Sequence, residues 1–380
     1  MKVTCMQENL AKGLSIVSRA VAARSTLPVL GNILLATDQS RLKLAATNLE
    51  IGITCWIGAK VEEDGATTVP ARTFVDLINA LPQGPVDMDL AVRTQTLTVT
   101  GGRFTNNVKG VDAQEFPIIP KAEEDNATLL RIAPDVLRLM IDQVVFTAAT
   151  DESRPILTGV LAKFSGKTLT LAAADGFRLS VRTAQMEDGV DEPLEVIIPA
   201  RALAELGRIA GDQVDPISIM ITPQRSQILF HLTNIDLVSQ LIDGKFPDYN
   251  AIIPKSTGTK AVIDANLMLK ACKAANVFAR EAANIVRRSI VPGDEITPGH
   301  VQIGAQSAET GDNAGDLDAS ITGSPMEIAF NVKYLIDVLN VAGAQQVALE
   351  TNNASSPGVI RAVGNDAFTH VIMPMHIGGR

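Results

Sequence analysis

Cysteine, aromatic residues and long apolar runs are scarce in this sequence. The three cysteines, Cys5, Cys55 and Cys272, are far apart and form no Cys-x-x-Cys pair. This spacing excludes a disulfide framework or zinc ribbon and favours a reducing compartment. No run of 18 apolar residues occurs, and the N-terminus lacks a signal-peptide core. We therefore expect a soluble, cytoplasmic protein.

The sequence also lacks the motifs of common active sites. Residues 165–168 read Ser-Gly-Lys-Thr, but Leu161 stands where a phosphate-binding loop needs glycine. The histidines have no metal-ligand spacing, and no His-Glu-x-x-His or Gly-x-Ser-x-Gly motif occurs. The segment 309–318 is rich in acidic residues and glycine but lacks the calcium-loop pattern, so we expect a solvated hairpin loop there. The sequence predicts no catalytic residue, metal or cofactor.

Length and charge set broad limits. A chain of 380 residues is too long for one ordinary core, which favours two or three domains. Only 4% of the residues are aromatic, so the cores must be built mainly from aliphatic side chains. The net charge of −9 argues against a protein that is basic overall, but it leaves open a basic face.

One pattern occurs three times along the chain. A strand end followed by an amphipathic helix is expected at residues 69–82, 198–211 and 330–343. Its second position, at Pro70, Pro199 and Asn331, recurs after 129 and 132 residues. An earlier helix is expected at 7–21, 133–148 and 264–279. Short helices after Pro-Ala are common, but independent landmarks with the same spacing favour a true repeat.

Strand signals fill the remainder of each copy. Residues 41–57 and 167–183 alternate around polar turns, which is typical of hairpins. The first two copies end alike, at 115–120 and 245–254. We predict an α+β fold of three β-rich domains, each with two helices, at 1–121, 122–254 and 255–380. Unpaired strand edges at the two ends of such a row would be covered in a closed head-to-tail dimer.

Seven ordered motifs carry a family resemblance. Residues 26–35 (TLPVLGNILL), 47–53 (TNLEIGI), 69–72 (VPAR), 174–180 (ADGFRLS), 245–254 (KFPDYNAIIP), 330–340 (FNVKYLIDVLN) and 371–375 (VIMPM) together make the chain resemble the bacterial beta sliding clamps. These proteins are the processivity subunits of DNA polymerase III, and the resemblance covers the whole chain. It implies a non-enzymatic homodimer that forms a six-domain ring around double-stranded DNA, without sequence preference.

The resemblance also implies which residues meet DNA. Two helices per domain would line the channel, and they carry basic residues beside several acids, so the expected face is only mildly positive. A position in the loop before residue 26 is basic in the family and contacts DNA. The candidates are Arg24, Lys12, Arg72, Arg138, Arg201, Arg208, Lys270 and Lys273, with Arg19 and Lys333 nearby. Ordinary solvated helix faces are the alternative interpretation.

A second surface implied by the resemblance is a hydrophobic groove between the second and third domains. In the family it binds short motifs of the polymerase catalytic subunit, the clamp loader and other replication and repair proteins. Its residues here would be Leu157, Ala174, Gly176, Phe177, Arg178, Leu179, Pro247, Ile252, Asn331, Tyr334, Ile372, Met373, Pro374 and Met375. Flexible methionines suit varied apolar ligands, and Arg178 could hydrogen-bond a peptide. Residues 371–375 could instead be a plain core strand.

Departures from the family pattern concern the groove and the chain end. Phe177 and Ala251 stand where polar or basic residues are frequent, and residues 376–380 extend past the usual end. Two rival functions remain open at this point. One is an enzyme or ligand-binding protein on a repeated sheet scaffold, and the other is a monomeric peptide-binding scaffold. The dimer contact is expected to join residues 103–108 to residues 278–280.

Overall fold

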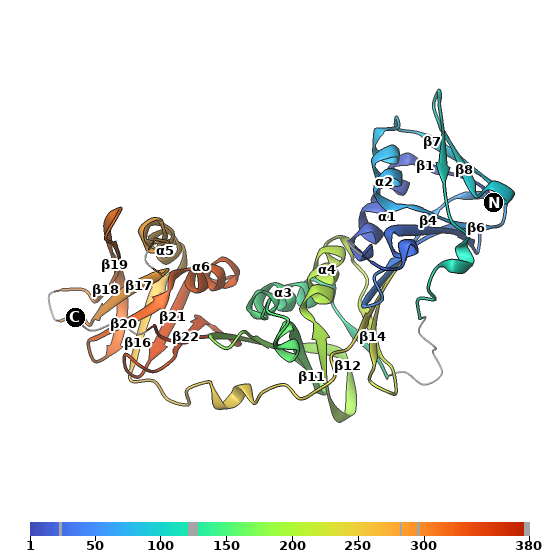
Figure 1. The fold of residues 1–380 in the computed structure, drawn as a ribbon. Coiled ribbons are helices and arrows are strands. Elements are labelled where there is room, and N and C mark those ends of the chain that lie inside the picture. The colour runs from blue at the N-terminus through green and yellow to red at the C-terminus, as the bar shows by residue number, and fades with distance from the viewer. Residues whose placement is uncertain (23–24, 121–127, 282, 295–296, 376–380) are drawn as a thin grey trace. The chain divides into compact units, whose positions relative to one another are not determined.

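The computed structural model describes residues 1–22, 25–120, 128–281, 283–294 and 297–375 (Figure 1). Contacts between residues divide this part of the chain into two compact units. The first unit comprises residues 1–138, 186–188 and 201–241. The second comprises residues 139–185 and 189–200 and those from 242 onward. Each unit is described by itself below.

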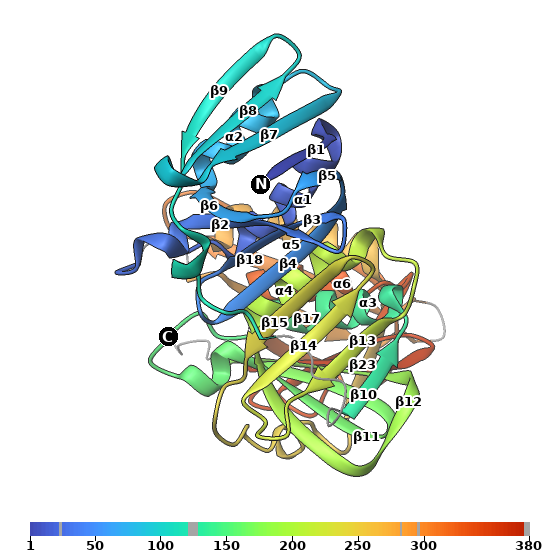
Figure 2. The ribbon, with the colours of Figure 1, turned by 90° about the vertical axis from the view of Figure 1, so that its right-hand side faces the viewer.

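Two antiparallel sheets build the first unit. The smaller has the order β5 (Lys60–Glu63), β1 (Lys2–Met6), β7 (Pro85–Ala91), β8 (Thr96–Gly101) and β9 (Phe104–Lys109). The larger has the order β10 (Thr128–Ile132), β13 (Ile217–Ile221), β14 (Gln227–Leu232), β15 (Ile235–Gln240), β4 (Ile51–Gly58), β3 (Arg41–Thr47), β2 (Asn32–Asp38) and β6 (Ala66–Pro70). Figure 2 shows this larger sheet from β13 across to β3. Because β4 pairs with β15, the sheet runs from the first repeat into the second.

One ten-stranded sheet dominates the second unit. Its order is β11 (Gly159–Ala174), β12 (Arg178–Pro199), β23 (Asn365–Ile372), β22 (Gly358–Ala362), β21 (Gln346–Thr351), β16 (Thr259–Asp264), β19 (Gly311–Gly323), β18 (His300–Ser307), β17 (Ile285–Val291) and β20 (Met326–Asn331). Here β12 pairs with β23, with Val181 opposite Thr369. The second repeat is thus joined to the third by the same kind of strand pair that joins the first to the second.

The described chain contains two α-helices per repeat, as the sequence predicts. They are α1 (Gln7–Val17), α2 (Ala71–Ala80), α3 (Pro134–Val144), α4 (Ala200–Ile209), α5 (Ala265–Ala279) and α6 (Val332–Val341). In α4, Leu203 and Leu206 are buried whereas Arg201 and Arg208 are exposed. This three- and four-residue spacing is that of a helix lying on a sheet. At the start of α5 the Asp264 carboxylate accepts a hydrogen bond from the Leu267 amide (2.8 Å), which fixes the first turn.

The first helices of repeats one and two are shorter than predicted. Helix α1 ends at Val17 and α3 at Val144, and each is followed by a 3-10 turn, η1 (Ser18–Ala20) or η5 (Val145–Thr147). The amides of Val21 and Ala148 bond to carbonyls three residues earlier, at 3.2 and 3.1 Å. Such tightening satisfies carbonyls that the helix end leaves open.

The repeat is visible in individual backbone bonds. The 3-10 turns η2 (Pro28–Gly31) and η6 (Pro155–Thr158) each begin with the proline of a corresponding motif. The amide of Ala22 donates to the carbonyl of Leu30 (3.1 Å), and the amide of Ala149 donates to that of Leu157 (2.8 Å). The same contact therefore recurs after 127 residues, which supports the repeat independently of side-chain type.

The structure corrects the prediction of a loop at residues 309–318, because most of this segment is a strand. Only a turn at 308–310 is irregular, and Gly311 begins strand β19, which pairs with β18 from Ser307↔Gly311 to His300↔Asp318. Acidic and glycine residues are poor strand formers, which misled the sequence interpretation. They fit here because residues 311–318 have a strand neighbour on one side and lie largely exposed.

The core of the third repeat lies beneath α5 and α6, which pack together on the strands (Figure 1). Met268, Leu335 and Phe368 are fully buried there. A Cβ at Gly358 would lie 2.3 Å from the ring of Phe330, so this strand position has room only for glycine. All three cysteines are free and buried. Among the described residues no helix has the length and apolar character needed to cross a membrane.

Candidate partner groove and nucleic-acid interface

The residues predicted for the groove all lie in the second unit. Leu157 is in η6, Ala174 ends β11, and Gly176 and Phe177 form the turn before Arg178 and Leu179 of β12. Pro247 and Ile252 flank the 3-10 turn η8 (Tyr249–Ala251), and Asn331 ends β20 just before α6, whose first turn carries Tyr334. Ile372 ends β23 before Met373, Pro374 and Met375. We call this set the partner groove.

Strand pairing places the two ends of the partner groove side by side. Arg178 lies opposite Ile372, and the Met373 amide donates to the carbonyl of Phe177 (2.8 Å). The Asp175 carboxylate accepts from the amides of Phe177 (2.8 Å) and Arg178 (3.0 Å). Gly176 has φ +95°, which glycine adopts without strain. The turn that presents Phe177 is therefore fixed by its own backbone bonds.

Exposure separates the groove surface from its support. Phe177 is 56% exposed, and Ile252 and Met373 are each 39% exposed. Leu179 and Ile372 are buried, within apolar clusters below the surface. The exposed trio can contact an apolar ligand, whereas the buried pair holds the strands that carry it. Asn331 caps α6 by accepting from the Lys333 amide (3.0 Å).

Arg178 is engaged inside the protein. Its guanidinium donates to Asp337 (2.6 Å), to Asp175 (3.0 Å) and to the Phe146 carbonyl (2.9 Å). It also lies over the rings of Tyr334 (4.3 Å) and Phe146 (5.4 Å). With 11% of its side chain exposed, Arg178 joins β12 to α6. The structure thus gives it a positioning role, and its hydrogen bond to a peptide stays a prediction.

A buried Ser–His pair lies along the β12–β23 pairing. Ser180 and His370 are both fully buried, with Ser180 Oγ 2.7 Å from His370 Nδ1. The imidazole stacks on Phe146 at 5.6 Å. Burial, with a smaller effect of Arg178, lowers the pKa of His370 to about 3, so the ring is neutral. Because neither group reaches solvent, the pair ties the strands together and supplies no nucleophile.

The candidate DNA-contacting residues lie on exposed helix faces. In the first unit these are Lys12, Arg72, Arg138, Arg201 and Arg208, and in the second they are Lys270 and Lys273. Arg24 lies outside the described residues. Arg72, Arg201, Lys270 and Lys273 make no ion pair within the described part of the chain.

Other cations of the first unit are paired with acids, either across the repeat junction or within α4. Lys12 contacts Asp212 (2.9 Å) and lowers the pKa of that carboxyl. Arg208 contacts Glu205 (2.7 Å), which also receives Arg19 (3.4 Å). These pairs reduce the field that phosphates would experience, so the helix layer is less basic than its count of cations indicates.

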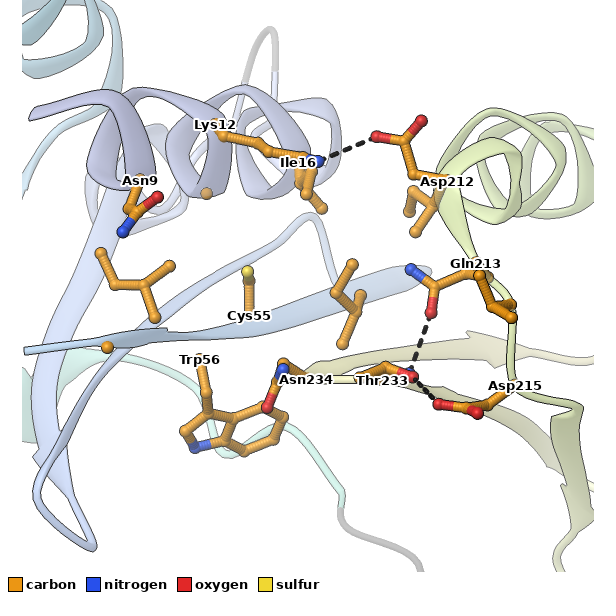
Figure 3. Close-up of a pocket in the computed structure, with 16 residues that line it drawn as sticks. Asn9, Lys12, Ile16, Cys55, Trp56, Asp212, Gln213, Asp215, Thr233 and Asn234 are labelled. Carbon is orange, nitrogen blue, oxygen red and sulfur yellow. Dashed lines mark hydrogen bonds and ion pairs between the residues drawn. The ribbon is translucent and has the colours of Figure 1, made fainter. Parts of the chain in front are cut away.

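A pocket of about 470 Å³ lies below the Lys12–Asp212 pair (Figure 3). Helix α1, strand β4 and the β14–β15 turn form its walls. Several polar groups are already bonded, since Gln213 accepts from the Thr233 amide (3.0 Å) and Thr233 donates to Asp215 (2.9 Å). Burial raises the pKa of the Cys55 thiol to about 11, so it is protonated at neutral pH. The pocket offers no activated nucleophile.

Comparison with known proteins covers the whole chain. Family models described as DNA polymerase III beta subunit match residues 1–120 (N-terminal domain), 131–248 (central domain) and 250–376 (C-terminal domain). The beta sliding clamp of Synechocystis is 32% identical over 99% of this chain and 100% of its own length. That of Bacillus subtilis is 31% identical over 99% of both. This chain belongs to the DNA polymerase III beta subunit family.

Solved structures agree with the assignment to the beta sliding clamps. The crystal structure of the DNA polymerase sliding clamp from Bacillus subtilis superposes with a TM-score of 0.93, 29% identity and 99% coverage of both chains. The DNA polymerase III beta subunit from Pseudomonas aeruginosa gives 0.89 and 29%, with 99% of this chain and 100% of that chain covered. The clamp fold predicted from the sequence is confirmed. Because sliding clamps are non-catalytic processivity factors, the rival interpretation as an enzyme is set aside.

Sequence reasoning missed the residues that hold the partner groove together. Asp337, Phe146, Ser180 and His370 all act through contacts between segments distant in the sequence. The role of Asp175 could have been predicted, because Asp-Gly before a strand is a common turn signal. The other four have no local pattern that would mark them.

Proposed function

We propose that this beta clamp encircles double-stranded DNA in the cytoplasm as a head-to-tail homodimeric ring. In this role it tethers the catalytic subunit of DNA polymerase III, the clamp loader and other replication and repair proteins through the partner groove. The observation that carries the proposal is the match of three beta-subunit domain models, in order, along the chain.

Weak contact with DNA is what such a ring requires. Non-specific phosphate contacts give dissociation constants of roughly 10⁻⁴ to 10⁻⁶ M, too weak to retain a polymerase for long. A closed ring leaves DNA only by opening or by passing an end. Lys12 and Arg208 are partly neutralised by Asp212 and Glu205, which favours low friction over affinity. Arg72 and Arg201 remain available to attract the backbone.

Two exposed strand edges support the homodimer. Strand β9 pairs only with β8 among the described residues, and Arg103 and Lys109 stand at its ends. The first part of β19 pairs only with β18 in the described chain and carries Asp312 and Asp316. One edge is basic and the other acidic, so two copies could pair them head to tail. A Cβ at Gly311 would lie 3.8 Å from the ring of Phe278, so β19 begins beside the expected contact at residues 278–280.

Retention on DNA of different topology tests the proposal. After loading onto nicked circular DNA, the protein should remain through gel filtration and should be lost once the circle is cut. Blocking both ends of the linear DNA with bound protein should restore retention, which separates sliding from dissociation. Retention on the circle should also survive a rise in salt that abolishes phosphate contacts. Equal loss from circular and linear DNA would refute the ring.

A further inference from the structure

The junction between the first and second repeats copies the backbone of the partner groove. Asn48 accepts from the amides of Glu50 (3.1 Å) and Ile51 (2.8 Å), as Asp175 does from Phe177 and Arg178. Leu49 has φ +75°, matching Gly176 at +95°. The Gln240 amide donates to the Glu50 carbonyl (2.8 Å), the counterpart of the bond from Met373 to Phe177.

A small pocket accompanies this copied turn. It has a volume of about 130 Å³ and is lined by residues of the turn, by segment 117–120, and by Gln227, Val238 and Gln240. Segment 117–120 has the same Ile-Ile-Pro ending as residues 252–254 beside the partner groove. Ile119 packs on Gly52, where a Cβ would lie 2.9 Å from its Cγ2. Ile119 therefore forms one wall of the pocket, whereas the neighbouring Ile118 projects into solvent.

The rim of the pocket is apolar with one acidic group. Ile118 is 93% exposed and Leu49 is 51% exposed. Glu50 stands where the partner groove has Phe177, and Gln240 where it has Met373. Glu50 is exposed and makes no ion pair among the described residues. Its unpaired charge beside two aliphatic side chains selects a ligand that is both aliphatic and cationic.

We propose that this junction is a second docking site, for a short extended segment of a partner protein with a branched aliphatic residue beside lysine or arginine. The aliphatic side chain packs on Ile118 and Leu49, and the cation pairs with Glu50. The amide side chains of Gln227 and Gln240 can bond the peptide backbone. A volume of 130 Å³ admits about one side chain, which fits a peptide better than a folded surface. The site is independent of ring closure and of the partner groove.

Methyl NMR on the full-length protein tests this site, because isoleucines mark both junctions. The probes are the hexapeptide Gly-Lys-Ile-Lys-Pro-Gly and its counterpart with glutamate in place of lysine. The lysine peptide should shift the methyl signals of Ile118 and Ile119 and leave those of Ile252 and Ile253 unchanged. The glutamate peptide should bind at least fivefold more weakly.

Variants of the rim separate the contributions. Glu50→Gln should weaken the lysine peptide up to about fivefold, the scale of one exposed ion pair. Ile118→Ser should weaken it about tenfold through lost apolar contact, with little effect on folding because the side chain is exposed. Met373→Ala in the partner groove should change nothing at this site.

Three outcomes would overturn the proposal. These are shifts confined to Ile252 and Ile253, no shift at Ile118 with millimolar peptide, or equal shifts from both peptides. None of them bears on retention on circular DNA, so failure here is distinguishable from failure of the ring.

Discussion

At the scale of single residues, buried polar groups hold the partner groove in register. The Arg178 guanidinium donates to two carboxylates and a carbonyl, and it lies over two aromatic rings, those of Phe146 and Tyr334. Removing it would leave Asp337 without its partner and remove the contacts with Phe146 and Tyr334. The costs of a lost, partly exposed ion pair and of lost packing would then add. Substitution of the exposed groove side chains, Phe177, Ile252 and Met373, should cost less stability than substitution of Arg178.

His370 makes stability depend on pH. Its pKa in the folded protein is about 3, below the ordinary value of 6.5, so between these values the unfolded chain binds a proton that the folded chain does not. Its contribution to stability is therefore complete above about pH 6.5 and is lost as the pH falls toward 3. We expect the melting temperature of wild type to drop more between pH 7 and pH 5 than that of His370→Gln.

Calorimetry at the two pH values checks this expectation. The comparison of pH-dependent drops removes any constant cost of the substitution itself. The extra slope in wild type should approach one proton, or about 1.4 kcal/mol of unfolding free energy per pH unit. Identical drops in the two proteins would show that His370 takes up a proton in the folded state.

At the scale of elements, the end of β23 has two tasks. Ile372 is buried in the core, whereas Met373 is 39% exposed and bonds the turn at Phe177 through its backbone. The strand can therefore keep its place when its last side chains change.

We predict that Met373→Ala together with Met375→Ala abolishes binding of partner peptides while the dimer persists. The two thioethers are lost, but the backbone bonds to Phe177 and Ala329 remain. Fluorescence anisotropy with a labelled peptide from the polymerase catalytic subunit measures the first effect. Light scattering measures the second. Unchanged peptide affinity would contradict the groove assignment, and loss of the dimer would show that the strand end is structural.

Elements were predictable where a periodic pattern recurs. The six α-helices of the described residues and the hairpin turns at 47–51 and 174–178 follow from apolar spacing and turn residues repeated at nearly constant offset. Strand β19 was not predictable, because its first half is an exposed edge whose glycine and aspartate content is typical of loops. The lengths of α1 and α3 were overestimated, because the apolar spacing continues through the 3-10 turns that follow them.

The groove residues follow from the family resemblance, but their separate roles do not. Sequence could not tell that Phe177 faces solvent while Leu179, two positions on, is buried. It also could not pair Ser180 with His370 or Arg178 with Asp337, because those contacts cross 190 and 159 residues of chain.

At the scale of the whole molecule, charge is distributed unevenly although the chain is acidic overall. The exposed helix faces carry both basic and acidic groups, the edge at β9 is basic, and the edge at β19 is acidic. A net charge of −9 disfavours unspecific contact with nucleic acid. Local basic groups can still meet DNA where the ring would hold it.

The edges lead to a prediction about assembly. Arg103→Glu should weaken the dimer about a hundredfold, because like charges facing each other across an interface cost several kcal/mol. At micromolar concentration, light scattering should then give a mass approaching the chain mass of 40.3 kDa, where wild type gives twice that value. Arg225→Glu, an equal reversal in the turn between β13 and β14, should leave the wild-type mass unchanged. Adding Asp316→Arg to Arg103→Glu should recover the dimer, since the two edges regain opposite signs. A stable dimer of Arg103→Glu at every concentration would place the interface elsewhere.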